Sequence, residues 1–373
     1  MEKRLKKIMI HINSLGKGGA ERVACMVASY LASEGIETIL ATSWQEEGEY
    51  QPDPAVRRMH AGLKESQKGL GRLGKLWFRT ANLRELVRQE KPDLLLSFCV
   101  KANYRAVQAA LGTKIPVVVS VRNDPKVDYT GRVKGLMNRL FLNRADGCVF
   151  QTEEAREFFA PVLKNKSRII CNPVADKYLA AKRRQAKKKI VFAGRLVEQK
   201  NPFLLVYAFR DLQEKYPDYR LFLYGDNFED QCKENLLTYL QKPECDDIRS
   251  KIHFMGISDS LDTELADAAM FVLPSNYEGM PNALMEAMAI GLPVISTDCP
   301  CGGSRYLISH KENGLLVPVG DKKAMTEAMI YYIENPLEAE RMGKNAKERL
   351  KQQEKGRICR QWKEYLEEVV ERA

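Results

Sequence analysis

The sequence contains no long apolar run. No part of the 373 residues approaches the roughly 18 consecutive apolar residues of a membrane-spanning helix. The basic start, Met1–Lys7, is followed by a very short apolar run and then by polar residues, so a secretory signal peptide is not expected. These absences argue against an integral membrane protein and a secreted protein, and they predict a cytoplasmic location.

Patterns that bind metal ions are also missing. The four histidines are widely separated, and the nine cysteines are scattered without the spacing of a zinc site. We therefore expect free thiols in a reducing compartment and no histidine-based metal site.

The charge is unbalanced toward bases. There are 59 Lys and Arg against 49 Asp and Glu, a net charge of +10, which favours an anionic partner. The bases cluster at Lys64–Arg88 and at Tyr129–Arg144, where they alternate with large apolar residues. The second cluster is typical either of a basic amphipathic segment on a membrane surface or of a helix that packs its apolar face on the domain. Nucleic-acid-binding motifs are absent, so no nucleic-acid partner is expected.

Short apolar runs alternate with helical stretches along the whole chain. This pattern predicts doubly wound α/β domains with parallel sheets. The length favours two domains, 1–175 and 176–350, followed by a helix at 351–373. Asn172–Val174 and the charged run Lys182–Lys189 are interpreted as a linker. The strands expected in the first domain are Lys7–Ile12, Ile36–Thr42, Leu94–Cys99, Pro116–Val121 and Gly147–Gln151, with helices at Arg22–Ser33 and Asn103–Leu111.

The most informative stretch is Pro274–Gly291. It follows the buried strand Ala269–Leu273 and is expected to form a tight turn and then a helix, with Asn282 as the N-cap and Gly291 as the terminator. The free N–H groups at the start of such a helix bind anions, and ligands of parallel sheets bind at the carboxyl ends of strands.

Two glutamates lie in this unit. Glu278 falls in the turn, and Glu286 falls in the helix among Met and Ala residues. Burial of a carboxylate is costly without a partner, so a hydrogen-bonding ligand or a buried base would relieve that cost. The alternative is a solvated loop acid and an ordinary surface acid.

These residues resemble the E-x7-E signature of retaining glycosyltransferases of family 4. The match includes Pro-Ser before the turn, Glu-Gly-x-Pro, Glu-Ala-Met-Ala-x-Gly-x-Pro-Val-Ile, Thr297-Asp298, Gly302-Gly303 and Asn313–Asp321. The resemblance implies the GT-B fold, in which two Rossmann-like domains face a cleft and the last helix crosses back to the first domain. It implies transfer of a hexosyl or N-acetylhexosaminyl group from a nucleotide donor, with a UDP-sugar expected.

The resemblance also implies roles for particular residues. Glu278, Arg195 and Lys200 would be catalytic, because two cations after the strand Lys189–Gly194 can neutralise a departing diphosphate. A solvated basic loop is the alternative for the two cations. The donor would be bound by Gly18, Gly19, Gly256, Ile257, Gly279, Met280, Pro281, Asn282 and Glu286.

Three positions depart from familiar patterns. The loop from Gly16 has Glu21 where a dinucleotide-binding G-x-G-x-x-G motif ends in glycine, so that motif fails. Arg122 and Asn123 stand where many relatives have a histidine near the sugar, and they contact the sugar or acceptor or merely cap a loop. Tyr306 replaces a common glutamate, which leaves a donor contact there in doubt.

The sequence and the resemblance also indicate which cofactors and partners to expect. No Asp-x-Asp pair occurs, which favours donor binding without a metal or any other cofactor. The expected partners are the nucleotide sugar, a glycan or lipid-linked acceptor of cell-surface polysaccharide synthesis, and an anionic membrane surface reached through the basic first domain at the inner membrane face. The alternatives are a nucleotide-sugar epimerase of the same fold and a non-catalytic nucleotide-sugar-binding scaffold.

Overall fold

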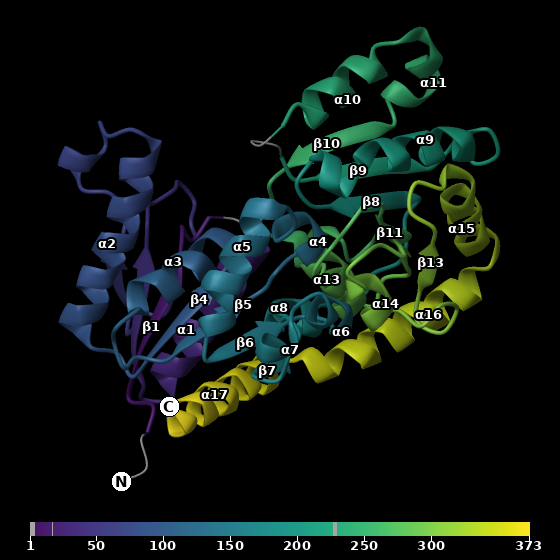
Figure 1. Ribbon diagram of the computed structural model, residues 1–373. Helices are drawn as coiled ribbons and strands as arrows, with labels where there is room; N and C mark the ends of the chain where they lie inside the picture. Colours follow the sequence, from purple (N-terminus) through teal and green to yellow (C-terminus); the bar gives the residue numbers. More distant parts are fainter. Residues whose placement is uncertain (1–3, 17, 227–229) are drawn as a thin grey trace. The chain divides into compact units, whose positions relative to one another are not determined.

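The computed structural model describes residues 4–16, 18–226 and 230–373, and it divides into two compact units. Unit 1 contains residues 1–173 together with 355–373, and unit 2 contains residues 174–354. Each unit is an α/β domain with one all-parallel sheet, which confirms the predicted fold class (Figure 1). The predicted linker is wrong in part, because Lys187 and Lys189 form ion pairs with Asp267 inside unit 2.

Unit 1 has a seven-stranded sheet in the order β3-β2-β1-β4-β5-β6-β7. Its strands are β1 (Lys7–Ile12), β2 (Glu37–Thr42), β3 (Arg57–His60), β4 (Leu94–Phe98), β5 (Val117–Ser120), β6 (Gly147–Phe150) and β7 (Ser167–Ile169). Its helices are α1 (Gly19–Ser33), α2 (Arg72–Glu90), α3 (Val100–Ala110), α4 (Pro125–Asp128), α5 (Arg132–Leu140), α6 (Glu153–Glu157), α7 (Pro161–Lys164) and α17 (Lys355–Arg372).

Unit 2 repeats this topology with a six-stranded sheet in the order β10-β9-β8-β11-β12-β13. Its strands are β8 (Lys189–Ala193), β9 (Arg220–Tyr224), β10 (Ile252–Gly256), β11 (Met270–Leu273), β12 (Val294–Thr297) and β13 (Leu315–Val317). Its helices are α8 (Asp176–Ala180), α9 (Pro202–Gln213), α10 (Cys232–Leu240), α11 (Asp246–Arg249), α12 (Leu261–Glu264), α13 (Asn282–Ile290), α14 (Gly303–Leu307), α15 (Lys322–Glu334) and α16 (Pro336–Leu350).

The order of the strands defines where ligands bind in each unit. In both sheets the chain first moves outward from the central strand and then returns to its other side. The switch points lie between β1 and β4 in unit 1 and between β8 and β11 in unit 2. Loops that follow these strands diverge there and leave a crevice at the carboxyl edge of the sheet, where open parallel sheets bind their ligands.

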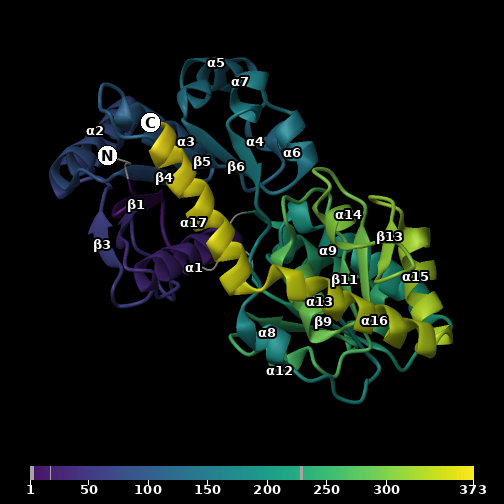
Figure 2. The same cartoon turned by 90° about the horizontal axis from the view of Figure 1, so that it is seen from below.

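The last helix, α17, belongs to unit 1. It lies beside α1, and its inward face buries Trp362, Tyr365 and Leu366 (Figure 2). The Trp362 ring centre lies 5.5 Å from that of Phe98 on β4. The Tyr365 hydroxyl accepts the N–H of Cys148 on β6 at 2.8 Å and donates to the carbonyl of Lys166. A sheet face of unit 1 is therefore completed by the end of the chain.

These contacts generate a prediction about stability. The Tyr365→Phe substitution removes the hydroxyl contacts but leaves the Cys148 N–H bonded to the Lys166 carbonyl at 3.2 Å, so it should destabilise unit 1 by about 0.5–1.5 kcal/mol. The expected fall in the melting temperature is roughly 2–4 °C per kcal/mol, measured by calorimetry. Tyr306→Phe is the matched control, because Tyr306 is 40% exposed. An equal change in both variants would contradict the role given to the Tyr365 hydroxyl.

Candidate functional site

The candidate site in unit 2 begins at the switch point of its sheet. Glu278 follows β11 and is 4% exposed. One of its carboxylate oxygens, Oε1, accepts from Lys200 Nζ at 2.5 Å and from Ser275 Oγ at 2.6 Å. Lys200 ends the loop that follows β8. The structure thus brings together two of the predicted catalytic residues from loops 78 positions apart in the sequence.

Backbone contacts hold these two loops against each other. The Asn276 N–H donates to the Gln199 carbonyl at 2.8 Å, and the Gln199 side chain donates to the Tyr277 carbonyl at 3.0 Å. Asn201 has a left-handed backbone (φ +47°), and its side-chain oxygen caps α9 by accepting the N–H of Leu204. The loop after β8 therefore has one defined path, and Lys200 is held where it meets Glu278.

The third predicted catalytic residue, Arg195, lies on the same loop. It is exposed, and its guanidinium donates to the Gln199 side chain at 3.2 Å. Gly194, just before it, adopts φ +156°. A side chain at Gly225 would meet the Gly194 carbonyl at 2.0 Å, so the ends of β8 and β9 approach as closely as backbone allows. Arg195 is thus placed on the exposed side of the loop that carries Lys200.

Helix α13 starts beside Glu278. Its first residue is Asn282 and its N-cap position is Pro281, so the prediction that Asn282 is the N-cap was wrong by one residue. Pro281 provides no side-chain cap, and the first-turn N–H groups of an α-helix lack acceptors within the helix. Together with the positive end of the helix dipole, they make this terminus suited to an anion.

The turn before α13 is fixed by close backbone packing. The Glu278 N–H donates to the Pro300 carbonyl at 2.9 Å. A Cβ atom at Gly303 would lie 1.8 Å from the Gly279 carbonyl oxygen, so only glycine fits at Gly303. Met280 is buried at 5% exposure. The predicted donor-binding turn, from Gly279 to Asn282, is therefore a rigid element held between the strand ends.

The far end of α13 ends as predicted. Gly291 adopts φ +93°, and its N–H bonds to the Met288 carbonyl while that of Leu292 bonds to Ala287. This is a Schellman motif. Glu286, in the second turn, is only 4% exposed, so it is not the surface acid of the alternative interpretation. Burial also raises the pKa of the Cys299 thiol to about 12, with the Glu278 carboxylate adding to the shift.

The remaining donor-binding candidates of unit 2 lie at the end of β10. Gly256 adopts φ +68°, and its carbonyl accepts the Gly225 N–H at 2.7 Å. Ile257 is 55% exposed. Gly256 is the last residue of this edge strand and Ile257 follows it, two strands away from β8. They lie at the same carboxyl edge as Glu278.

Unit 1 carries the other predicted residues. Gly18 is the N-cap of α1, which begins at Gly19 and not at Arg22 as predicted. A side chain at Gly18 would collide with the Glu21 carboxylate, which lies 2.0 Å from the position of its Cβ. Lys17, in the same predicted loop, lies outside the described residues. The loop follows β1 and so reaches the switch point of this sheet.

Arg122 and Asn123 follow β5. Arg122 donates to the Asn172 side-chain oxygen, and its guanidinium lies 5.6 Å from the centre of the Phe98 ring. Its other two nitrogens, Nε and Nη1, are buried without a hydrogen-bond partner among residues 4–16, 18–226 and 230–373. Burial lowers the pKa of Arg122 to about 10, so the side chain is still charged at neutral pH. Asn123 makes a long contact of 3.5 Å with Asp128.

Several residues of these sites were missed by the sequence prediction. Asn172 was assigned to a linker, yet it is buried and bonds to both Arg122 and Gln151. Cys99, which follows β4, has a backbone φ of +72°, a value that is rare for residues other than glycine. Ser275 was noted only as part of a motif. Its hydroxyl contact with Glu278 has no signature in local sequence.

Two cavities of the structure lie away from the residues described above, one between α2 and α3 and one beside Lys187–Lys189. No group of three His, Cys, Asp or Glu side chains that could hold a metal occurs within the described residues, and metal independence remains a prediction. No helix in the described part of the chain is long and apolar enough to cross a membrane.

The unit 2 site yields a prediction about the buried ion pair. Lys200→Met should destabilise the protein by about 3–5 kcal/mol, because it leaves the Glu278 carboxylate buried without its counterion. The double variant Lys200→Met/Glu278→Gln should recover part of that loss, and denaturant unfolding measures both. Lys323→Met, at a side chain that is 85% exposed, is the control. A double variant no more stable than Lys200→Met would contradict the coupling.

Both halves of the chain resemble known protein families. The family model described as "Glycosyltransferase Family 4" matches residues 17–178, and the one described as "Glycosyl transferases group 1" matches residues 177–349. The chain is 27% identical to an uncharacterized glycosyltransferase of Haemophilus influenzae, over 97% of this chain and all of the relative.

Two further comparisons connect the chain to named proteins. It is 26% identical to the N-acetylgalactosamine-N,N'-diacetylbacillosaminyl-diphospho-undecaprenol 4-alpha-N-acetylgalactosaminyltransferase of Campylobacter jejuni, over 97% of this chain and all of that protein. The crystal structure of Anabaena HepE with UDP and glucose superposes with a TM-score of 0.79 at 18% identity, covering 96% of this chain and 98% of that one. The structural likeness supports the GT-B fold.

Proposed function

We propose that this chain is a GT-B glycosyltransferase, and that it moves a sugar from a UDP-sugar to a lipid-linked or glycan acceptor, with retention of anomeric configuration and without a metal. The observation that carries the proposal is the buried Lys200–Glu278 pair beside the start of α13. It puts a cation, a carboxylate and a helix N-terminus at one switch point.

Each part of this arrangement has a role in the proposed reaction. The bond between the anomeric carbon and the diphosphate oxygen breaks, a bond to the acceptor oxygen forms, and the acceptor proton leaves with the UDP. Negative charge grows on the diphosphate, and Arg195, Lys200 and the N–H groups from Gly279 to Asn282 would stabilise it. Because Lys200 and these N–H groups are held by the fold before the substrate arrives, they cost little reorganisation.

The two buried acids, Glu278 and Glu286, would contact the sugar and the ribose of the donor. Glu278 would position the sugar and stabilise positive charge near the anomeric carbon, with Lys200 and Ser275 fixing its orientation. Glu286 would accept hydrogen bonds from the ribose hydroxyls. Gly256 and Ile257 are proposed to contact the base.

Residues of unit 1 are proposed for the remaining contacts. Gly18 and Gly19 would contact the diphosphate, since the absence of a side chain permits close approach. Arg122 has two buried nitrogens available for hydrogen bonds, and with Asn123 it would contact the sugar or acceptor.

The named relatives support the substrate classes. The Campylobacter relative acts on a sugar carried by diphospho-undecaprenol, and a Rhizobium meliloti relative, 25% identical over 84% of this chain, is a lipopolysaccharide core glycosyltransferase. The HepE structures contain UDP, and one contains UDP-glucose. We therefore propose a UDP-hexose or UDP-N-acetylhexosamine donor and a role in cell-surface polysaccharide synthesis at the inner membrane face.

The proposal is tested with Glu278→Ala. In a panel of UDP-glucose, UDP-galactose, UDP-GlcNAc, UDP-GalNAc and GDP-mannose, we expect thermal stabilisation and slow hydrolysis with one of the UDP-sugars. Glu278→Ala should lower the rate of UDP release by about 10²–10³, because it removes transition-state stabilisation. Glu327→Ala, whose side chain is 64% exposed, is the matched control.

The outcomes separate the proposal from its alternatives. An epimer of the donor formed without an acceptor, detected by proton NMR, would indicate an epimerase. Donor binding without any UDP release would favour a non-catalytic scaffold. Normal turnover by Glu278→Ala would refute the role of this residue.

A further inference from the structure

Helix α2 exposes large apolar side chains. None of residues 72–81 is buried, whereas the second half of the helix buries Asn82, Leu83, Leu86 and Val87. Leu73 is 82% exposed, Trp77 65% and Leu76 51%. A helix that only covered its own domain would turn such residues inward.

Helix α5 shows the same arrangement. It has no buried residue, and Val133, Leu136 and Leu140 are all exposed. The sequence left open whether its apolar face packs on the domain. The structure excludes that packing for these three side chains, although Leu142, just beyond the helix, is buried.

Bases surround both apolar sets. From Ser66 to Arg84 the chain has five Lys and Arg residues and no acid, and from Tyr129 to Arg144 it has four and no acid. Most single exposed apolar residues need no explanation. Here they recur on two helices, and all the charged residues of these two stretches are cations.

The two helices share one face of the unit 1 sheet. Right-handed crossovers from β3 to β4, β4 to β5 and β5 to β6 all run in the same direction across the sheet, which places α2, α3 and α5 on one side. Helix α3 lies between the other two. Arg84 of α2 donates to the Gln108 and Ala109 carbonyls of α3, and Tyr104 of α3 bonds to Asn138 of α5.

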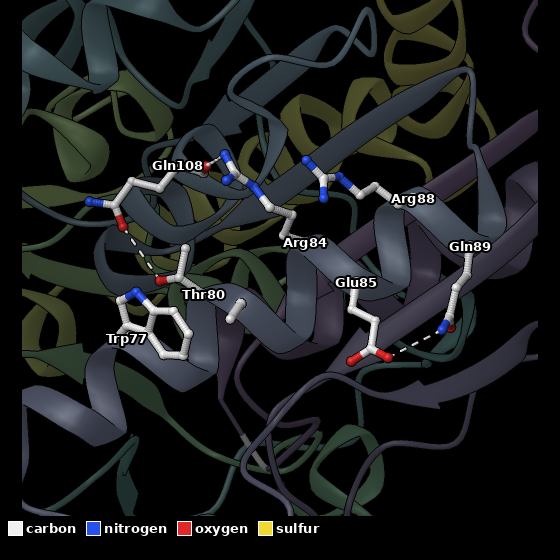
Figure 3. A pocket seen from close by; sticks show the side chains of 8 residues that line it. Trp77, Thr80, Arg84, Glu85, Arg88, Gln89 and Gln108 are labelled. Carbon is white, nitrogen blue, oxygen red and sulfur yellow. Dashed lines mark hydrogen bonds between the residues drawn. The ribbon is translucent and has the colours of Figure 1, made fainter.

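A groove marks the junction of α2 and α3. It has a volume of about 490 Å³, and Figure 3 shows Trp77 at one end and Arg88 at the other, both from α2. Arg84 is engaged with the α3 carbonyls. Arg88 is exposed and adds a cation along the groove, whereas the exposed Glu85 adds an acid that pairs with Lys64 at 3.2 Å.

We propose that the surface formed by the first half of α2 and by α5 docks on an anionic lipid bilayer, with the leucines and Trp77 at the headgroup boundary and the bases on lipid phosphates. This docking surface rests on the proposed function, because a lipid-linked acceptor is located in a membrane that the enzyme has to reach. Two copies joined through this surface would bring like charges together, and nucleic acid would leave the leucines without an apolar partner.

The test is flotation of the full-length protein with vesicles. Vesicles of phosphatidylcholine with 30% phosphatidylglycerol should bind at least tenfold more protein than vesicles of phosphatidylcholine alone at low salt, and binding should weaken as salt increases. The Leu73→Ser/Trp77→Ser variant should lose at least tenfold in binding, and so should Arg72→Gln/Lys75→Gln/Arg79→Gln. Val133→Ser/Leu136→Ser should also weaken binding.

The control is Leu337→Ser, because Leu337 is 80% exposed but lies in unit 2. It should bind vesicles like the unchanged protein. Equal binding to both kinds of vesicle, no binding, or unchanged binding of the α2 variants would overturn the proposal. A dimer that the α2 variants convert to monomer would also overturn it, because a second copy would then cover the surface.

Failure of this inference is distinguishable from failure of the proposed function. Thermal stabilisation by UDP is measured without vesicles, and the surface variants should retain it, since none of them changes a proposed donor-binding residue. UDP binding without vesicle binding would overturn only the docking surface. Vesicle binding without binding of any nucleotide sugar would overturn only the transferase assignment.

Discussion

The contact between Lys200 and Glu278 is the interaction on which the rest of unit 2 depends. Neither charge is stable in a buried position alone, and each compensates the desolvation of the other. The Lys200 side chain is 14% exposed and that of Glu278 is 6% exposed. The pair can form only if the loop after β8 and the turn after β11 approach each other, which the bonds between Gln199 and residues 276–277 ensure. The two loops meet because β8 and β11 are neighbouring strands at the switch point of the sheet, so both loops leave the same edge side by side.

The parts of this arrangement that could be read from the sequence are those with local signals. Gly291 ends α13 because a left-handed residue is needed there, and Asn201 followed by Pro202 marks the start of α9. Buried strands of five or six residues were found from their apolar runs. The strand β3 was not, because its sequence, Arg57–His60, is polar and its pattern does not alternate. Glu278 was found because a long family motif contains it, but its contact with Ser275 depends on a turn geometry that no spacing specifies.

Non-local contacts account for most of what was missed in unit 1. Asn172 lies in a Pro-containing stretch that is typical of linkers, and only the folded chain places it against Arg122, 50 positions earlier. The pairing matters for Arg122, whose guanidinium is held between this amide and the Phe98 ring. Its two unpartnered buried nitrogens have a desolvation cost that a native fold rarely leaves uncompensated. A bound oxygen acceptor would compensate this cost, which is why contact with a ligand is the role proposed for Arg122.

The chain crosses between the two units twice. It passes from unit 1 to unit 2 after Pro173 and returns after Glu354, because α17 belongs to unit 1. On the unit 2 side the two crossings lie together, since the Val174 N–H donates to the Gln353 carbonyl at 2.9 Å and Val174 pairs with Glu354. The Lys200–Glu278 pair lies entirely in unit 2 and the Arg122 cluster entirely in unit 1, so each is held in place by the fold of its own unit.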